Sequence, residues 1–167
     1  MTTFYAYTES PIGRLLLTAD EEALTGLYMN DSATALRTAP DAVERDDHPI
    51  LAEARRQIAE YFTGSRRTFD LPLRTEGTPF QRRVWEELKA IPYGETISYG
   101  ELARRIGDPN ASRAVGMANG RNPISIIVPC HRVIGANQRL TGYGGGLERK
   151  ATLLTLESGQ CAMPSSM

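Results

Sequence analysis

The sequence predicts an α/β protein of two small domains, a sheet with one helix over residues 1–77 and a helix-rich domain over residues 78–157. The length of 167 residues allows one ordinary domain or two small ones. Short apolar or alternating runs fill the first part, whereas apolar residues at helical spacing dominate the second. Contents of 41% hydrophobic and 23% charged residues exclude disordered and collagen-like classes. Residues 158–167 are expected to form a flexible tail.

The N-terminal domain is expected to open with a strand meander. Its apolar or alternating runs are separated by turn residues and cover residues 4–8, 15–19 and 24–29. After a polar connector, apolar residues recur at helical spacing from Ile50 to Phe62, and Gly64 ends that helix. Residues 69–73 alternate as a further strand. Because no ionisable cluster in this half suggests chemistry, we interpret it as scaffold.

The second domain begins at a helix-start signal. Thr78 and Pro79 supply an N-cap and a first-turn proline. Ser98 and Glu101 form a capping box for a short helix, and residues 108–119 are expected to form the next one. Two short helices joined by a tight turn give the outline of a helix-turn-helix. Plain helical hairpins share this outline, so taken alone it favours a structural role over DNA binding.

A candidate nucleophile follows an apolar run. Residues 124–128 are expected to form a buried strand, which Pro129 interrupts immediately before Cys130 and His131. Because the backbone turns at the proline, the imidazole can lie beside the sulfur and favour the reactive thiolate. The alternative is that Cys130 is a small buried hydrophobe and His131 is solvated. The residues alone leave both interpretations open.

A glycine-rich loop over residues 139–146 precedes a final amphipathic helix over residues 147–156. Such a loop can bind phosphate, but no Lys-Ser/Thr pair follows it as in a nucleotide-binding loop. A flexible connector is one alternative. The other, which we adopt, is that the glycines allow the backbone to approach a planar base closely.

Charge and cysteine content narrow the possible partners. Residues 1–77 carry 8 Lys+Arg and 13 Asp+Glu, a balance of −5, whereas residues 78–167 carry 11 and 7, a balance of +4. The second half can therefore dock a polyanion, although this imbalance is a weak signal. The 2 cysteines and 2 histidines lack metal-finger spacing, so no structural metal is expected. Short apolar runs and the lack of a secretory start predict a cytoplasmic protein.

A long motif surrounds Cys130 and extends upstream. It comprises Phe80-Gln81, Val84-Trp85, Ile91-Pro92-Tyr93-Gly94, Ser98-Tyr99, Ser112-Arg113-Ala114-Val115-Gly116, residues 122–134, Gly142-Tyr143-Gly144-Gly145-Gly146 and Arg149-Lys150. These residues resemble the O6-alkylguanine-DNA alkyltransferases, or methylated-DNA–protein-cysteine methyltransferases. The resemblance covers residues 78–157 and implies a winged-helix-like C-terminal domain with a helix-turn-helix. Residues 1–77 resemble the family only in layout, which is ribonuclease-H-like.

The resemblance implies that Cys130 accepts an alkyl group from O6 of guanine in DNA. His131, a bridging water and Glu157 would form the relay that removes the thiol proton, and Tyr99 would donate a proton to guanine N3. The thioether sulfur formed is a poor leaving group, so the protein should react once. No cofactor is expected, because the damaged DNA itself supplies the alkyl group.

The resemblance also implies a mode of DNA binding. The lesion must leave the duplex to reach the thiol, and Arg113 would occupy the vacated stack. Small residues on the same helix would allow close approach to the minor groove of double-stranded DNA. The protein is expected to be a monomer in solution that can cluster on DNA. The helix residues concerned are Arg113, Ala114, Gly116, Ala118 and Asn119.

A base pocket is implied around the nucleophile. Asn122 would support the turn that ties the helix to the site, and the carbonyls of Cys130 and Val133 would read the guanine amino group. Tyr143 and the backbone of Gly144 would flank the base. Some family members have serine at the position of Gly144, so only backbone contacts are expected there.

Two further departures from family patterns matter. Ser125 stands where some members have proline, and this loss of rigidity would admit bulkier alkyl groups. Some members bind zinc in the N-terminal domain, but no cysteine precedes Cys130 here, and His48 is the only soft donor in that half. The accessory zinc is therefore not expected.

Two other classes of function remain as alternatives. A Cys130–His131–Glu157 hydrolase is conceivable, because an acyl thioester can be hydrolysed whereas a thioether cannot. A non-catalytic recogniser of alkylated DNA is the third class, since family relatives keep the base pocket but replace the cysteine with tryptophan. The retained cysteine argues against this third class.

Overall fold

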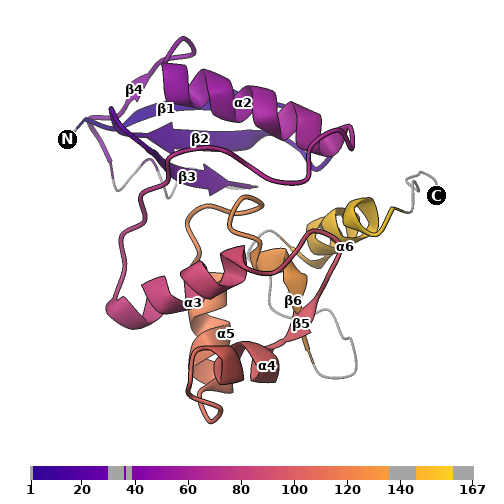
Figure 1. Ribbon diagram of the computed structural model, residues 1–167. Helices are drawn as coiled ribbons and strands as arrows, with labels where there is room; N and C mark the ends of the chain where they lie inside the picture. Colours follow the sequence, from indigo (N-terminus) through magenta and orange to yellow (C-terminus); the bar gives the residue numbers. More distant parts are fainter. Residues whose placement is uncertain (1, 30–35, 37–38, 136–145, 160–167) are drawn as a thin grey trace. The chain divides into compact units, whose positions relative to one another are not determined.

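The computed structural model describes residues 2–29, 36, 39–135 and 146–159. The chain divides into two compact units, Met1–Thr75 and Glu76–Met167, and each is considered by itself (Figure 1). The mixed α/β class predicted from the sequence is confirmed. No helix within the described ranges is long and apolar enough to cross a membrane.

The first unit is built on a sheet with the strand order β3-β2-β1-β4. The strands β1 (Phe4–Thr8), β2 (Leu15–Ala19) and β3 (Leu24–Tyr28) pair antiparallel, as the predicted meander requires. The short strand β4 (Val43–Glu44) adds to β1 in parallel. Every residue of β2 is buried, because this strand has a neighbour on each side and a helix over one face.

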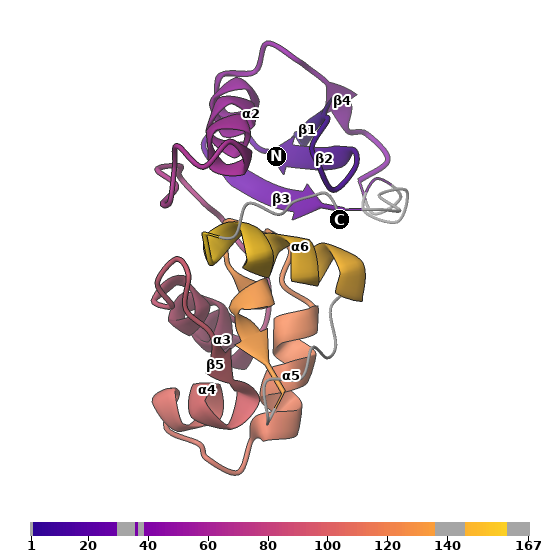
Figure 2. The ribbon, with the colours of Figure 1, turned by 90° about the vertical axis from the view of Figure 1, so that its right-hand side faces the viewer.

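Helix α2 (Pro49–Phe62) lies along one face of this sheet (Figure 2). His48 is the N-cap residue, and its Nδ1 atom accepts a hydrogen bond from the Ile50 N–H at 3.2 Å. The chain leaves the helix through Gly64, whose φ of 84° is readily accessible to glycine. The helix packs on the sheet through the buried residues Leu51, Ala54, Gln57, Ile58 and Tyr61.

The strand expected at residues 69–73 is wrong. The structure has only a single parallel bridge between Leu24 and Leu73, made by the Leu24 N–H to the Pro72 carbonyl at 2.8 Å and the Arg74 N–H to the Leu24 carbonyl at 2.9 Å. Pro72 has no N–H, so it cannot donate to a sheet ladder, and alternation of apolar residues does not reveal this limit.

The second unit begins with helix α3 (Pro79–Lys89), where Thr78 and Gln81 form a reciprocal capping box. Helix α3 buries Trp85, whose Nε1 donates to the Ala118 carbonyl at 2.8 Å. This bond ties the first helix of the unit to the end of the helix expected to bind DNA.

The helix pair consists of α4 (Tyr99–Arg105) and α5 (Ser112–Gly120). The Oγ atom of Ser98 accepts from the Glu101 N–H at 3.0 Å, which is one half of the predicted capping box, whereas the Glu101 carboxylate accepts from Arg104 and Arg105. Helix α5 begins later than expected, because residues 108–111 form a turn closed by the Ala111 N–H to the Asp108 carbonyl at 3.0 Å. The predicted outline of two short helices and a turn is present.

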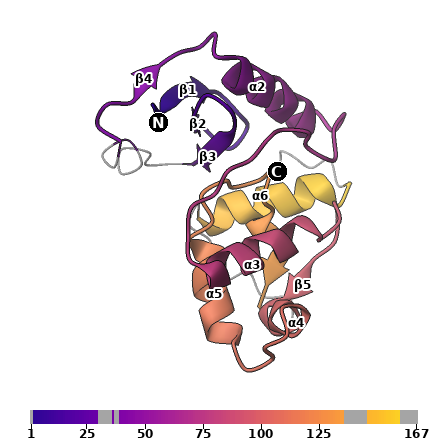
Figure 3. The same ribbon diagram turned by 60° about the vertical axis from the view of Figure 1, so that its left-hand side comes forward.

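The remaining elements carry the candidate site. A 3-10 helix, η1 (Cys130–Arg132), runs directly into strand β6 (Val133–Ile134), which pairs in parallel with β5 (Ile97–Ser98). Helix α6 (Leu147–Glu157) packs on η1. Figure 3 shows α4 at one end of this unit and α6 at the other. Figures 1 and 2 show the orange segment that contains β6 between these two helices.

Candidate active site

The segment before the cysteine is a buried turn, which corrects the expected strand at residues 124–128. The Val128 N–H donates to the Ile124 carbonyl at 3.0 Å, and the Ile127 N–H donates to the Ser125 carbonyl at 2.8 Å. Between them Ile126 has a φ of 71°, in the left-handed region that a β-branched residue rarely adopts. Such strain costs on the order of 1–3 kcal/mol and is sustained only where surrounding contacts enforce it. Burial of Ile124, Ile126 and Val128 supplies such contacts.

Asn122 holds this turn from one side. Its Oδ1 accepts from the Ile124 N–H at 3.0 Å, while its Nδ2 donates to the Val128 carbonyl at 2.7 Å and to the Ile124 carbonyl at 3.4 Å. One amide side chain therefore satisfies backbone groups at both ends of the turn. The support expected of Asn122 has this physical basis.

Cys130 is the first residue of η1 and is 4% exposed. Pro129 precedes it as a buried N-cap residue without helical geometry, so the backbone changes direction at the predicted position. The Cys130 carbonyl accepts a hydrogen bond from Asn119 Nδ2 at 3.3 Å. Helix α5 is thus connected directly to the backbone of the candidate nucleophile.

His131 and Glu157 form a buried pair. The His131 ring is fully buried, and its Nε2 lies 2.7 Å from Glu157 Oε2. Burial lowers the pKa of His131, and the attraction of Glu157 only partly opposes this effect. The second ring nitrogen, Nδ1, is buried without a hydrogen-bond partner among the described residues. A neutral imidazole that is held at one nitrogen can accept a proton at the other.

Arg132 joins the pair, a role the sequence analysis missed. Its Nε and Nη2 donate to the two carboxylate oxygens of Glu157 at 2.7 and 2.9 Å, and its Nη1 donates to the Ile91 carbonyl at 2.6 Å. Burial raises the pKa of Glu157, but hydrogen bonds from His131 and Arg132 outweigh it and lower that pKa to about 2. Glu157 is therefore a carboxylate at neutral pH.

Lys150 is a second charged residue whose position the sequence analysis did not predict. It is fully buried, and its Nζ donates to the Val133 carbonyl at 2.7 Å. Burial lowers the pKa of Lys150, and the nearby Cys130 opposes this effect. A usable signal existed, because Lys150, Leu153 and Glu157 share one face of α6 at helical spacing.

The carbonyls expected to read a guanine amino group already accept protein hydrogen bonds, that of Cys130 from Asn119 and from the Val133 N–H, and that of Val133 from Lys150. A carbonyl oxygen has two lone pairs, so both of those on Cys130 are engaged, and a guanine amino group would have to share one of them. Their present partners fix the direction of both groups.

Tyr99 lies at the start of α4 and is half-buried. It faces α5 at Gly116, where an added β-carbon would lie 3.7 Å from the Tyr99 ring. The small residue at position 116 therefore lets the tyrosine ring lie close to α5. The parallel pairing of Ile97 with Val133 places the segment just before Tyr99 beside the segment just after η1.

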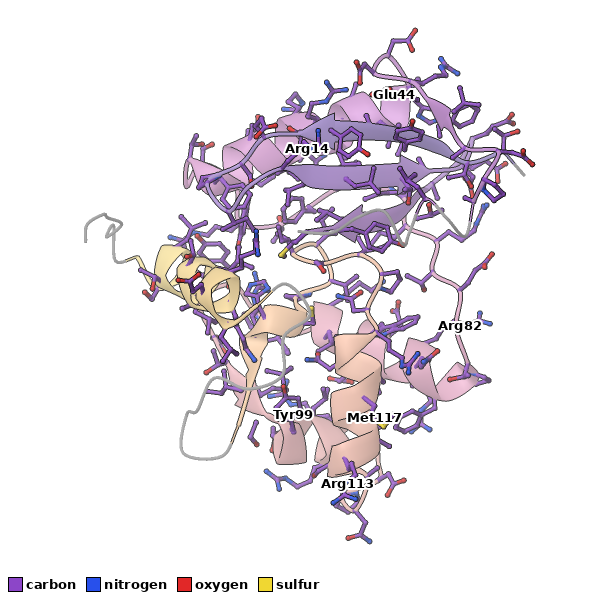
Figure 4. All side chains as sticks on the ribbon, turned by 180° about the vertical axis from the view of Figure 1, so that it is seen from behind. Arg14, Glu44, Arg82, Tyr99, Arg113 and Met117 are labelled. Carbon is purple, nitrogen blue, oxygen red and sulfur yellow. The ribbon has the colours of Figure 1, made fainter. Side chains whose placement is uncertain are left out.

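The residues expected to bind DNA separate into two groups. Arg113 and Ala114 are exposed on α5, and Figure 4 shows Arg113 and the exposed Met117 projecting from that helix. Ala118 and Asn119 are buried, and each bonds within the unit. This placement favours a structural role for Asn119 over a DNA contact.

Two predicted pocket residues, Tyr143 and Gly144, lie outside the described residues. Within the described ranges, no three His, Cys, Asp or Glu side chains are grouped so that they could hold a metal ion. The ionisable side chains that the structure places in and around η1 are Cys130, His131, Arg132, Lys150 and Glu157.

Two family models match nearly the whole chain. The ribonuclease-like domain of 6-O-methylguanine DNA methyltransferase matches residues 3–75, and the DNA-binding domain of the same family matches residues 79–159.

Named relatives are similar over nearly their full length. A methylated-DNA–protein-cysteine methyltransferase of Methanosarcina acetivorans is 53% identical over 158 residues, which cover 95% of this chain and 99% of that protein. The constitutive enzyme of that name from Bacillus subtilis is 47% identical over 156 residues, which cover 92% and 94%. The crystal structure of Mycobacterium tuberculosis OGT in complex with DNA is similar with a TM-score of 0.85 and 49% identity, covering 94% of both chains.

Proposed function

Because the chain belongs to the 6-O-methylguanine DNA methyltransferase family, it repairs DNA by alkyl transfer, and we propose that Cys130 is the residue that accepts the alkyl group. The observation that carries this assignment is the buried His131–Glu157 pair, which begins one residue after Cys130. It supplies a proton acceptor beside the only cysteine within the described part of the chain.

The transfer is a displacement at carbon. Glu157 is ionised, so it holds the proton-bearing Nε2 of His131 and leaves Nδ1 to take the Cys130 proton through a bridging water. The sulfur then forms a bond to the alkyl carbon as the bond from that carbon to O6 breaks. The electron pair of the broken bond stays on guanine, which takes a proton at N3 from Tyr99. The tyrosine regains a proton from solvent, and His131 releases to solvent the proton that it took from Cys130.

The product explains why each protein reacts once. The new bond at Cys130 is a thioether, and the His131–Glu157 pair can remove protons but supplies no group that displaces a thiolate from carbon. Incubation with a duplex containing O6-methylguanine should therefore place one methyl group on the peptide containing Cys130, as seen by mass spectrometry. Cys130→Ala should keep DNA binding and remain unmethylated.

Other outcomes decide between the alternatives. An unmodified Cys130 after prolonged exposure to methylated duplex would overturn the proposal. Full repair by Cys130→Ala would mean that the protein contributes binding alone. Repeated turnover of ester substrates, with no methyl transfer, would instead identify a hydrolase.

DNA binding belongs to the family, and we propose that α5 docks in the minor groove. Exposed Arg113 lies beside exposed Ala114, so the helix presents a cation next to a side chain that needs little space. Insertion of Arg113 into the base stack would stabilise the duplex after the lesion has left it.

Arg113→Ala is expected to slow methyl transfer from duplex about 10-fold, because unstacking a base costs a few kcal/mol that the arginine offsets. The reaction with free O6-methylguanine base should keep its rate, since no stack is vacated. Rapid-quench kinetics on both substrates measure this difference. Arg14→Ala removes the same charge from the first unit and serves as the control. Equal losses on duplex and free base would exclude the wedge role.

Three finer expectations complete the proposal. The protein acts as a monomer that can cluster along DNA, and it works in the cytoplasm. Sedimentation with duplexes of increasing length tests the first two, since clustering should make the number of bound copies rise more steeply than independent binding allows.

A further inference from the structure

Arg132 connects three parts of the second unit and is itself buried. Its guanidinium meets both carboxylate oxygens of Glu157 on α6, the carbonyl of Ile91 after α3, and the ring of Tyr93 at 5.7 Å from its centroid. A bidentate pair in a buried site fixes a carboxylate more strictly than one hydrogen bond can. The orientation of Glu157 towards His131 therefore depends on Arg132.

Side chains that carry opposite charges when ionised alternate from Cys130 to Arg132. Cys130 is next to His131, His131 is bonded to Glu157, and Glu157 is bonded to Arg132. The charged groups that act on the His131 ring are Glu157 and Lys150 from α6 and Arg132 from η1, and Cys130 in turn acts on Lys150. Two cations thus stand against one carboxylate before the Cys130–His131 pair is counted.

This balance determines how many protons the Cys130–His131 pair holds. With one proton the pair has no net charge, whether the proton is on sulfur or on the ring. With two protons the pair is a cation, and Arg132 and Lys150 repel it. Only the singly protonated pair can generate a thiolate beside an imidazolium, so losing the second proton is the step that makes the site competent.

We propose that Arg132 is a positioning residue that balances the charge of Glu157 and so keeps the Cys130–His131 pair singly protonated, and ready to react, at neutral and mildly acidic pH. This inference rests on the proposed function of Cys130. It extends that function by assigning a second role to the Cys-His-Arg segment, with the arginine acting through Glu157.

Removing the guanidinium charge should shift the acid limb of the pH–rate profile, which is the pH range in which the methyl-transfer rate rises to its plateau. In Arg132→Met, Glu157 keeps its charge without its partner, so His131 holds its proton up to a higher pH. The pH at which methyl transfer reaches half its plateau rate should rise by about one to three units, the usual effect of one neighbouring charge. Raising the pH should restore the part of the rate that is lost to protonation, while the plateau itself should fall because the bidentate contact with Glu157 is also gone.

Two further variants separate charge from structure. Arg132→Lys keeps the charge but cannot make the bidentate contact with Glu157. The acid limb of its pH–rate profile should therefore stay near that of the native protein, while its plateau rate falls. In the double variant Arg132→Met with Glu157→Gln, both charges are gone, and the acid limb should return to low pH. This double variant also avoids leaving an unpaired buried carboxylate if Arg132→Met fails to fold.

The test needs a readout that does not depend on repair. NMR titration of the His131 ring, in protein without DNA, should show its midpoint higher in Arg132→Met than in the native protein. The same comparison of Glu157→Gln with the double variant measures the arginine charge if the single variant is unstable. Unchanged His131 midpoints in both comparisons would overturn the proposal. A native protein that never methylates Cys130 would instead defeat the proposed function, while the His131 midpoints would still report on Arg132.

Discussion

Replacing Glu157 with glutamine is expected to slow methyl transfer to Cys130 by about 100-fold or more, in the range of an impaired general base. An amide cannot stabilise the imidazolium that forms when His131 takes the thiol proton. It also leaves Arg132 facing a neutral group in a buried site. Single-turnover kinetics with methylated duplex measure the loss. Glu148→Gln, an exposed change on the same helix, should keep the native rate.

The same substitution should remove a pH-dependent part of the stability. The pKa of Glu157 is about 2 in the folded protein and near 4.5 for an ordinary glutamate. Because the folded pKa is the lower one, this stabilisation is complete above pH ~4.5 and is lost as the pH falls towards 2. The difference corresponds to about 3 kcal/mol in the free energy of unfolding.

Urea denaturation at several pH values between about 3 and 7 measures this contribution. The native protein should lose stability steadily below pH ~4.5. The Glu157→Gln variant should be less stable than the native protein at pH 7, but its stability should change less below pH ~4.5. If the two proteins lost stability in parallel as the pH fell, Glu157 would not be the buried carboxylate responsible.

Asn122→Ala should have the second large effect, lowering the free energy of unfolding by about 2–4 kcal/mol and the transfer rate by about 100-fold. The variant loses all three hydrogen bonds to Ile124 and Val128 and leaves the Ile124 N–H without its acceptor, while the two carbonyls keep only the backbone donors Val128 and Cys130. The strained backbone of Ile126 would then be free to relax, and Cys130 would lose its fixed direction.

Denaturation and single-turnover kinetics on the same samples test this expectation. Asn110→Ala, at an exposed position in the turn between α4 and α5, is the matched control and should change neither value much. Asn122→Asp keeps an acceptor for the Ile124 N–H but sets a carboxylate against two carbonyls, so it should resemble Asn122→Ala. Native transfer by both variants would show that the turn holds Cys130 without this side chain.

Elements with local signals could be predicted from the sequence. The caps at Thr78 and Ser98 depend on residues three positions apart, so their bonds are visible in the chain itself. The strand predicted at residues 124–128 is wrong, because burial gives a strand and an internal turn the same apolar pattern. The distinguishing partner, Asn122, lies outside the run and acts through its side chain.

The candidate site was predictable where a motif names its members. Cys130 and His131 are adjacent, and the family resemblance supplied Glu157, which the structure places 2.7 Å from the histidine. Arg132 and Lys150 were missed because arginine and lysine are rarely buried, so their sequence positions suggest solvent. The fold brings Arg132 to the Glu157 carboxylate and Lys150 to the Val133 carbonyl, and these contacts join residues that are far apart in the sequence.

The parallel pairing of β5 with β6 bears on how far apart the groups that act on the two sides of a purine are held. Strand β5 leads into Tyr99, the proposed proton donor, and β6 follows the segment that carries Cys130. The main-chain hydrogen bonds between the two strands therefore set the spacing between these two segments. Substitutions of surface side chains should therefore leave this spacing unchanged. A one-residue shift in the β5–β6 register would instead displace both segments.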